Sequence, residues 1–248
     1  GLQVLVLNSR YLQGAETEER AIATLLGQHP EAMILTGASQ TENARRMLRH
    51  AAIPVIQTME LAPDPIDINI GLSQQDAGYA ATRHLIDLGH KVIGQISVPL
   101  DARALQRRRG YLDAIAEAGL EPLTISIERA SSFPLGAQLV GELLAQRSDM
   151  TGLFAGNDNL ALGAMFEAQR RGIRVPEDMA IVGFNDFELA AVAYPALTTV
   201  TTQRYEMGRR AAEIILEIVR GTGERPPQPI IDVGFTLAVR ESTAPPPR

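Results

Sequence analysis

The sequence has 248 residues, of which 45% are hydrophobic and 21% are charged, as in an ordinary soluble globular protein. Its formal net charge of −6 argues against nucleic-acid binding by these residues alone, because phosphate binding needs a concentrated basic surface. The chain has no cysteine, which excludes disulfides and thiolate metal sites. No apolar run approaches the roughly 20 residues needed to span a bilayer.

The first eight residues have neither an initiator Met nor the basic region of a secretory signal. We therefore expect the sequence to be part of a longer chain.

Short apolar or β-branched runs alternate with longer helical patterns along most of the chain. The expected strands are residues 3–8, 31–36, 54–58, 67–71, 91–97, 123–128, 152–156, 179–183, 197–201 and 231–238. The expected helices are residues 14–27, 40–50, 75–88, 101–118, 135–146, 158–171 and 204–220. Alternation of this kind predicts an α/β fold with parallel sheets flanked by helices. Because ten strands are many for one open sheet, we expect two sheets in two lobes.

Polar side chains follow the ends of several expected strands. In open parallel sheets, ligands bind beyond the carboxyl ends of the strands, so these side chains predict a shared binding cleft. The residues in question are Glu60, Arg103, Arg107, Ser131, Ser132, Asn157, Asp158, Asn185, Asp186 and Arg204.

The motifs of common enzyme classes are missing from the sequence. No two of the four histidines have a metal-site spacing, and a Gly-x-Ser-x-Gly elbow, a Walker loop and a Gly-x-Gly-x-x-Gly fingerprint do not occur. Asp158 and Asp186 could meet in the cleft, although helix capping is the simpler interpretation of both. We therefore expect a receptor for a small polar molecule, without metal or cofactor, rather than an enzyme.

Three stretches of the second half follow one another in a characteristic order. They are Gly-Asn-Asp-Asn-Leu-Ala-Leu-Gly (156–163), Gly-Ile-Arg-Val-Pro-Glu-Asp-Met-Ala-Ile-Val-Gly-Phe-Asn (172–185) and Pro-Ala-Leu-Thr-Thr-Val (195–200). Together with Arg107-Arg-Arg-Gly-Tyr111, an Arg-x-x-Gly-aromatic motif, they resemble the lactose/galactose-repressor (LacI/GalR) family of bacterial transcription regulators. Their order and spacing agree over nearly all of the chain.

The resemblance implies a type I periplasmic-binding-protein fold, in which two Rossmann-like lobes are joined by three crossovers. The N-terminal lobe would comprise residues 1–72 and 203–226, and the C-terminal lobe residues 73–202 and 227–248. Compared with the family, the DNA-binding helix-turn-helix and the first strand–helix unit of the N-terminal lobe are absent from the sequence. The resemblance further implies a cytoplasmic homodimer that does not bind membranes and reaches operator DNA only through an N-terminal domain outside these residues.

Several short segments are most similar to the gluconate-operon repressor branch of the family. They are Thr-Met-Glu (58–60), Asp-Ala-Arg (101–103), Ser-Ser-Phe (131–133), Asp-Met-Ala-Ile-Val-Gly-Phe (178–184) and Asp-Val-Gly-Phe-Thr-Leu (232–237).

Three arginines are candidates for effector binding. Arg107 falls on the position that contacts effector in many family members, and Arg103 lies one helical turn earlier on the same face. Arg204 lies at a lobe crossover. Guanidinium groups bind carboxylates through paired hydrogen bonds, so such a cluster favours an acidic sugar. Arg103 has an alternative role in solvating its helix.

The remaining candidates are amides, hydroxyls and one carboxylate. Asn157 and Asn185 can both donate to and accept from sugar hydroxyls. Many relatives have Asp where Asn185 stands, and losing that charge removes a group that would repel an anion. Ser131 and Ser132 replace an aromatic that stacks on the sugar in relatives, which favours an open-chain ligand. Glu60 matches an acidic, hydroxyl-binding position, or alternatively lies at the rim.

The expected function is therefore the effector-binding and dimerisation core of a repressor that senses a gluconate-like molecule by lobe closure. A periplasmic sugar-binding protein of a transporter has the same fold and is the alternative.

Overall fold

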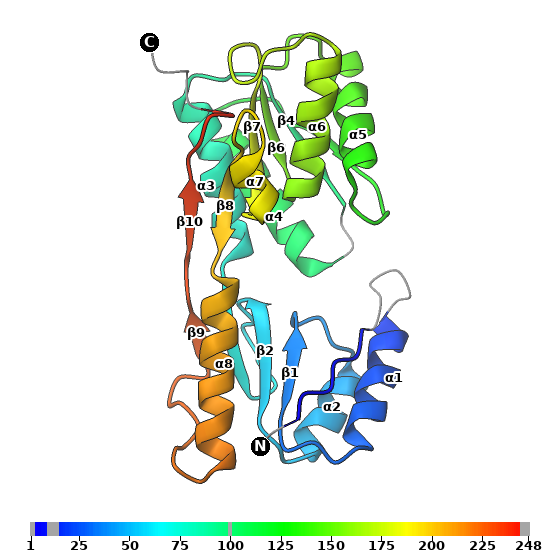
Figure 1. Cartoon of the computed structure of the whole chain (residues 1–248), viewed down its shortest axis with the longest axis vertical. Coiled ribbons are helices and arrows are strands. Elements are labelled where there is room, and N and C mark those ends of the chain that lie inside the picture. Colours follow the sequence, from blue (N-terminus) through cyan, green and yellow to red (C-terminus); the bar gives the residue numbers. More distant parts are fainter. Residues whose placement is uncertain (1–2, 9–14, 99–100, 244–248) are drawn as a thin grey trace. The chain divides into compact units, whose positions relative to one another are not determined.

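The computed structural model describes residues 3–8, 15–98 and 101–243 (Figure 1). It divides into two compact units, a smaller one of Gly1–Ser73 and Gln203–Gly234, and a larger one of Gln74–Thr202 and Phe235–Arg248. The chain therefore passes from one unit to the other three times. Each unit contains a sheet flanked by helices, and the expected α/β fold with two sheets is confirmed.

The smaller unit has a four-stranded sheet in which all strands run parallel. In pairing order the strands are β1 (Met33–Thr36), β2 (Val55–Glu60), β3 (Ile68–Leu72) and β9 (Ile230–Asp232). The helices of this unit are α1 (Ala15–Leu26), α2 (Glu42–His50) and α8 (Arg204–Val219).

The edge strand β1 of the smaller unit is covered on one face. Met33 and Leu35 are buried in an apolar cluster with residues of α1, α2 and β2. Ile34, which points to the other face, is 50% exposed. Helix α8 contacts β2 and β3. The sheet is therefore packed fully around β2 and β3 and less fully at β1.

Two strand predictions were wrong. Residues 3–8 form no strand and Val4 is 88% exposed, because strand structure requires a hydrogen-bonded neighbour and no strand of the described residues pairs with them. Residues 231–238 form two short strands instead of one. Strand β9 pairs with β3 in the smaller unit. Residues 227–234 therefore belong to the smaller unit, whereas the sequence predicted them in the C-terminal lobe.

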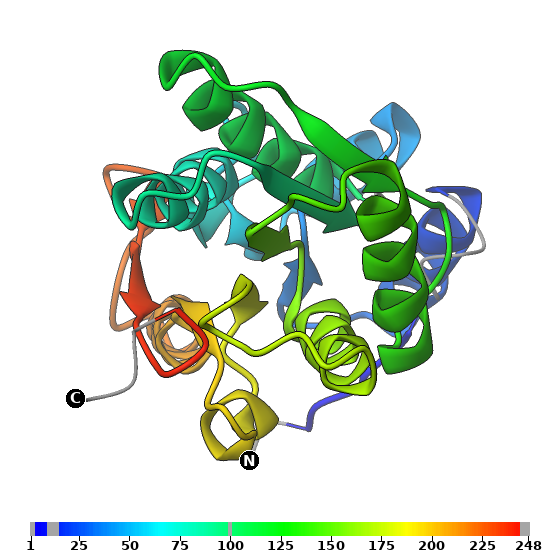
Figure 2. The ribbon, with the colours of Figure 1, turned by 90° about the horizontal axis from the view of Figure 1, so that it is seen from above.

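The larger unit has a six-stranded sheet, parallel except for β10, which runs antiparallel to β8. In pairing order the strands are β10 (Phe235–Ala238), β8 (Thr198–Thr202), β7 (Ala180–Asn185), β6 (Gly152–Ala155), β4 (Ile93–Ser97) and β5 (Leu123–Ser126). The helices are α3 (Gln74–Asp87), α4 (Ala102–Glu117), α5 (Phe133–Gln146), α6 (Asp158–Arg170) and the short α7 (Glu188–Val192), which the sequence did not predict. Helices α3 and α4 cover one face of the sheet, and α5 and α6 cover the other (Figure 2).

Glycines allow the helices of these two pairs to approach each other closely. A Cβ on Gly78 would lie 2.3 Å from the carbonyl oxygen of Arg107, and one on Gly110 would lie 2.0 Å from that of Gln75. Gly136 and Gly163 make the equivalent approach between α5 and α6. Backbone therefore packs directly against backbone in both pairs. Of the helices that the structure describes, none is long and apolar enough to cross a membrane.

Candidate functional site

The carboxyl ends of four neighbouring strands in the larger unit hold six of the eight predicted site residues. Strands β5, β4, β6 and β7 are adjacent and parallel, so their carboxyl ends lie at one edge of the sheet. Six predicted residues lie at this edge or in the first helical turns after it: Ser131, Ser132, Arg103, Arg107, Asn157 and Asn185.

Arg107 is held between a helix and a strand. Its Nη1 donates a 2.7 Å hydrogen bond to Oε1 of the buried Gln74, and its guanidinium carbon lies 4.5 Å from the centre of the Phe184 ring. A guanidinium that stacks on an aromatic face gains a cation–π attraction while its edge still carries donors. Both contacts fix the orientation of the Arg107 side chain at the end of β4 and β7.

The Arg-x-x-Gly-aromatic motif explains this placement. Gly110 allows α4 to contact the backbone of α3, which brings Arg107 to Gln74 at the start of α3. Tyr111 is fully buried; its hydroxyl donates to the carbonyl oxygen of Ile93 at 2.8 Å and accepts from the Leu123 N–H at 2.9 Å. The glycine and the tyrosine of the motif therefore dock α4, and the arginine is the residue that the docking positions.

Arg103 lies one turn before Arg107 on α4. Its Nε donates to Oδ2 of Asp101 at 2.8 Å, while Oδ1 of Asp101 caps the helix by accepting from the Ala104 N–H. Burial, and to a lesser extent the charge of Arg107, lowers the pKa of the Arg103 guanidinium to about 10. Arg103 is thus still charged at neutral pH, and the two guanidinium groups lie close enough to repel each other. An anion between them would relieve that repulsion.

Two of the predicted polar residues are helix N-caps. Oδ1 of Asn157 accepts from the Leu160 N–H at 3.1 Å at the start of α6. The hydroxyl of Ser132 accepts from the Leu135 N–H at 3.2 Å at the start of α5, and Ser131 precedes it, half-buried. The amide nitrogen of Asn157 is not used by the cap, so this side chain can cap the helix and donate to a ligand at once.

Asn185 ends β7 and begins a tight turn. Its φ is 112° and that of Asp186 is 56°, two consecutive non-glycine residues in the left-handed region. The predicted capping roles of Asp158 and Asp186 are wrong, because Asn157 caps α6 and no side chain caps α7. Asp158 instead binds the Phe187 N–H and the Thr199 hydroxyl, and Asp186 binds Arg240 and Thr201.

The other two predicted residues belong to the smaller unit. Glu60 ends β2 and is only 2% exposed; its Oε1 accepts a 2.6 Å hydrogen bond from the Ala38 N–H in the loop after β1. This burial excludes the alternative in which Glu60 lies at the rim. Arg204 is the first residue of α8 and is exposed.

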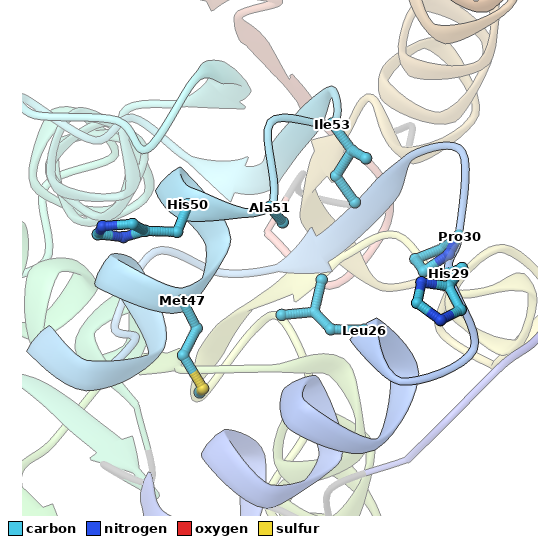
Figure 3. A pocket seen from close by; sticks show the side chains of 7 residues that line it. All are labelled: Leu26, His29, Pro30, Met47, His50, Ala51 and Ile53. Carbon is cyan, nitrogen blue, oxygen red and sulfur yellow. The ribbon is translucent and has the colours of Figure 1, made fainter.

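A hollow of about 540 Å³ lies in the smaller unit but contains none of the predicted residues. Figure 3 shows its wall, which consists of the ends of α1 and α2 with the loops before β1 and β2. The hollow is therefore at the amino ends of the strands, opposite to Glu60. It is lined by Leu26, His29, Pro30, Met47, His50, Ala51 and Ile53. Among the described residues, no group of three or more His, Asp or Glu could hold a metal ion.

The sequence did not predict the residues that support the site. Gln74 and Phe184 hold Arg107, and Asp158 with Thr199 holds the turn at Asn185. No local pattern connects Gln74 or Phe184 with Arg107, because both lie far from it in the sequence and only the fold brings them together.

Comparisons with known proteins agree with this architecture. A family model described as a periplasmic binding protein-like domain matches residues 82–243. The chain is 40% identical over 245 residues to the HTH-type transcriptional regulator GntR of Pseudomonas aeruginosa, covering 98% of this chain and 70% of that protein. It is 34% identical over 223 residues to GntR of Escherichia coli K12, covering 90% and 67%. It is 29% identical over 237 residues to IdnR of the same organism, covering 95% and 70%.

Solved structures show the same relationship. The transcription regulator GntR from Chromobacterium violaceum superposes with a TM-score of 0.91 at 39% identity, over 97% of this chain and 88% of that chain. A LacI-family regulator from Silicibacter pomeroyi gives a TM-score of 0.91 at 28% identity, over 97% and 72%. These relatives are transcriptional regulators and not enzymes, which confirms the expectation from the missing catalytic motifs.

Proposed function

The chain belongs to the LacI family of transcriptional regulators as the ligand-binding domain of such a regulator, and on that premise we propose that its effector is a sugar acid of the gluconate type. The observation that carries the proposal is the pair of guanidinium groups on α4. Arg107 is oriented by Gln74 and Phe184, and Arg103 lies one turn away with its charge retained. Arg103 is already paired with Asp101, and a ligand carboxylate matches the paired donors of the Arg107 guanidinium, which a neutral sugar does not.

The neighbouring residues suit the hydroxyl groups of such a ligand. Asn157 and Asn185 are amides at the ends of β6 and β7, and Ser131 and Ser132 are small and polar at the start of α5. None of the four is negatively charged, so none repels a carboxylate. Relatives named GntR and IdnR support an effector of this class.

We propose that Glu60 and Arg204 of the smaller unit also contribute to the effector site. An effector that contacts both units would favour the arrangement in which both sets of contacts form, and binding would act as a switch. The relatives are HTH-type regulators, so we propose that a DNA-binding domain outside these 248 residues reads out the switch in the cytoplasm.

We further propose that the regulator is a homodimer. Large apolar side chains of α5, α6 and the segment around α7 are exposed in the larger unit, and Phe133 packs edge-on against Phe166 with ring centres 6.2 Å apart. Leu189, Val192 and Tyr194 extend this set, with Tyr194 94% exposed. Exposed apolar groups of this kind are typical of protein interfaces. Sedimentation should give a dimer that Val192→Glu dissociates, whereas a monomeric wild-type protein would contradict the proposal.

Titration calorimetry tests the effector class. Gluconate is a charged open-chain compound, sorbitol is a neutral open-chain compound and glucose is a neutral ring. Comparing the three therefore separates the effect of charge from the effect of ring closure. We expect gluconate to bind at least tenfold more tightly than either neutral compound, because a charged hydrogen bond contributes about 1.5 kcal/mol or more. Equal affinity for gluconate and sorbitol would contradict recognition of the carboxylate.

A further inference from the structure

Asp158 is a fully buried carboxylate with an unusual set of partners. It is the first residue of α6, yet the helix is capped by Asn157, and the partners of Asp158 lie after β7 and on β8. Its Oδ1 accepts a 2.6 Å hydrogen bond from the Thr199 hydroxyl, and its Oδ2 accepts a 2.7 Å bond from the Phe187 N–H. Gly183 leaves the room for this group, since a Cβ there would lie 2.4 Å from Oδ1. The carboxylate is therefore built into the framework of β7 and β8.

The backbone N–H groups of Asp186 and Phe187, which follow Asn185, are both connected to this carboxylate by hydrogen bonds. The Phe187 N–H donates to it directly. The Asp186 N–H donates to the Thr199 hydroxyl oxygen at 3.4 Å, and that hydroxyl in turn donates to Asp158. Asn185 and Asp186 have positive φ values, which non-glycine residues keep only when their surroundings hold them there. Asp158 supplies that restraint.

We propose that Asp158 is a positioning residue for effector recognition, which holds the turn after β7 in the conformation that presents Asn185 to the effector. The inference rests on the proposed function, because Asn185 is one of the proposed effector contacts. The same turn is also connected to the proposed anion-binding part of the site. The guanidinium of Arg107 stacks on the ring of Phe184, which lies directly before Asn185. A displaced turn would therefore disturb both the amide and the arginine.

The charge of Asp158 gives this role a measurable signature. Burial raises its pKa to about 6, and the charge of Asp186 acts in the same direction, whereas the hydrogen bonds from Thr199 and Phe187 lower the pKa. Asp186 is itself paired with Arg240 at 2.8 Å. When Asp158 is protonated, one of its two oxygens carries a hydrogen and no longer accepts in the same way. The hold on the turn should then weaken.

Gluconate titrations of variants test the inference. Asp158→Ala removes both acceptors and should weaken gluconate binding at least tenfold. Asp158→Asn keeps one oxygen for the Phe187 N–H and should bind with intermediate affinity. The wild-type affinity should fall severalfold between pH 7.5 and pH 5, whereas gluconate itself stays ionised because carboxylic acids titrate near pH 4. Asp158→Asn cannot titrate and should show the wild-type pH 5 affinity at both pH values.

A matched control and an independent measurement complete the test. Asp149→Asn makes the same change at an exposed aspartate of the same unit, paired with Arg147, and should follow the wild type at both pH values. Wild-type affinity in Asp158→Ala, or an unchanged pH dependence in Asp158→Asn, would overturn the inference. If the alanine variant does not fold, hydrogen exchange of the Phe187 amide in Asp158→Asn decides. Faster exchange is expected because the neutral oxygen that this variant keeps is a weaker acceptor than the carboxylate, and unchanged protection would overturn the inference. Failure of the wild-type protein to bind gluconate would contradict the proposed function instead, because the exchange measurement needs no effector.

Discussion

The helix pairs of the larger unit and the long terminal helix of the smaller unit pack in different ways. In the larger unit, Gly78 and Gly110 bring α3 and α4 into direct backbone contact, and Gly136 and Gly163 do the same for α5 and α6. In the smaller unit, Gly208 of α8 has no described atom within 4 Å of where its Cβ would be. The four glycines of the larger unit are therefore needed for two helices to pack backbone against backbone, whereas Gly208 is not needed for any such contact among the described residues.

The difference bears on how the proposed site is held. Helices α4, α5 and α6 begin at the carboxyl ends of the strands, so locking them by backbone contact fixes the polar residues near their starts. Ser132 and Asn157 are the N-caps of α5 and α6, and Arg107 is in the second turn of α4. Arg204 is in the exposed first turn of α8, where packing of this kind is lacking. We expect the larger unit to supply a preorganised part of the site, which lowers the entropic cost of binding.

The largest effect should follow from adding one methyl group to the α3–α4 contact. Gly110→Ala would place its Cβ 2.0 Å from the carbonyl oxygen of Gln75, which is backbone and cannot rotate away. We expect the free energy of unfolding to fall by about 3 kcal/mol, the upper range for overpacking. Urea unfolding measures this loss, and titration calorimetry should show weaker gluconate binding because Arg107 moves with α4. A variant with wild-type stability would mean that the helices separate without cost.

Asp158 should affect stability and binding in opposite directions. Burial raises the pKa of Asp158 to about 6 in the fold, above the usual value of 3.8 for an aspartate, so the stability that it contributes is fully present below about pH 4 and is lost as the pH rises through 6. Asp158→Asn avoids that loss and should raise the free energy of unfolding at pH 7.5 by about 2 kcal/mol, with a smaller gain at pH 5. Thermal unfolding at the two pH values measures the difference. A variant that is less stable at pH 7.5 would show that the ionised carboxylate stabilises the fold.

Arg107→Ala should weaken binding more than it weakens the fold. We expect it to reduce gluconate binding by at least about 1.5 kcal/mol, as for a charged hydrogen bond, and to lower the free energy of unfolding by about 1 kcal/mol because its contacts with Gln74 and Phe184 are lost. Arg109→Ala is the matched control, because Arg109 is exposed on the same helix. A folded Arg107→Ala variant with full affinity would remove Arg107 from the site.

From the sequence, those parts of the candidate site that depend on local rules could be placed at the ends of the strands. Parallel strands place polar residues at their carboxyl ends, so Asn157 and Asn185 could be found from strand positions alone, and Arg107 from a motif. The contacts of Asp158 could not be predicted, because they involve Thr199, 41 residues away, and a backbone N–H. The strand expected at residues 3–8 failed for a related reason, since an apolar run becomes a strand only where another strand pairs with it.

The smallest effect should come from the same substitution at the unconstrained glycine. Gly208 lies inside α8 without a positive φ, so Gly208→Ala gains helix propensity and meets no described atom. We expect the free energy of unfolding to rise by about 0.5 to 1 kcal/mol. Gly221→Ala, at φ +68° just after the same helix, should instead destabilise the protein because the methyl group opposes a left-handed backbone. Opposite signs at Gly208 and Gly110 would show that the loss at Gly110 comes from close helix packing and not from a general need for glycine in helices. A loss of stability at Gly208 would contradict the contrast.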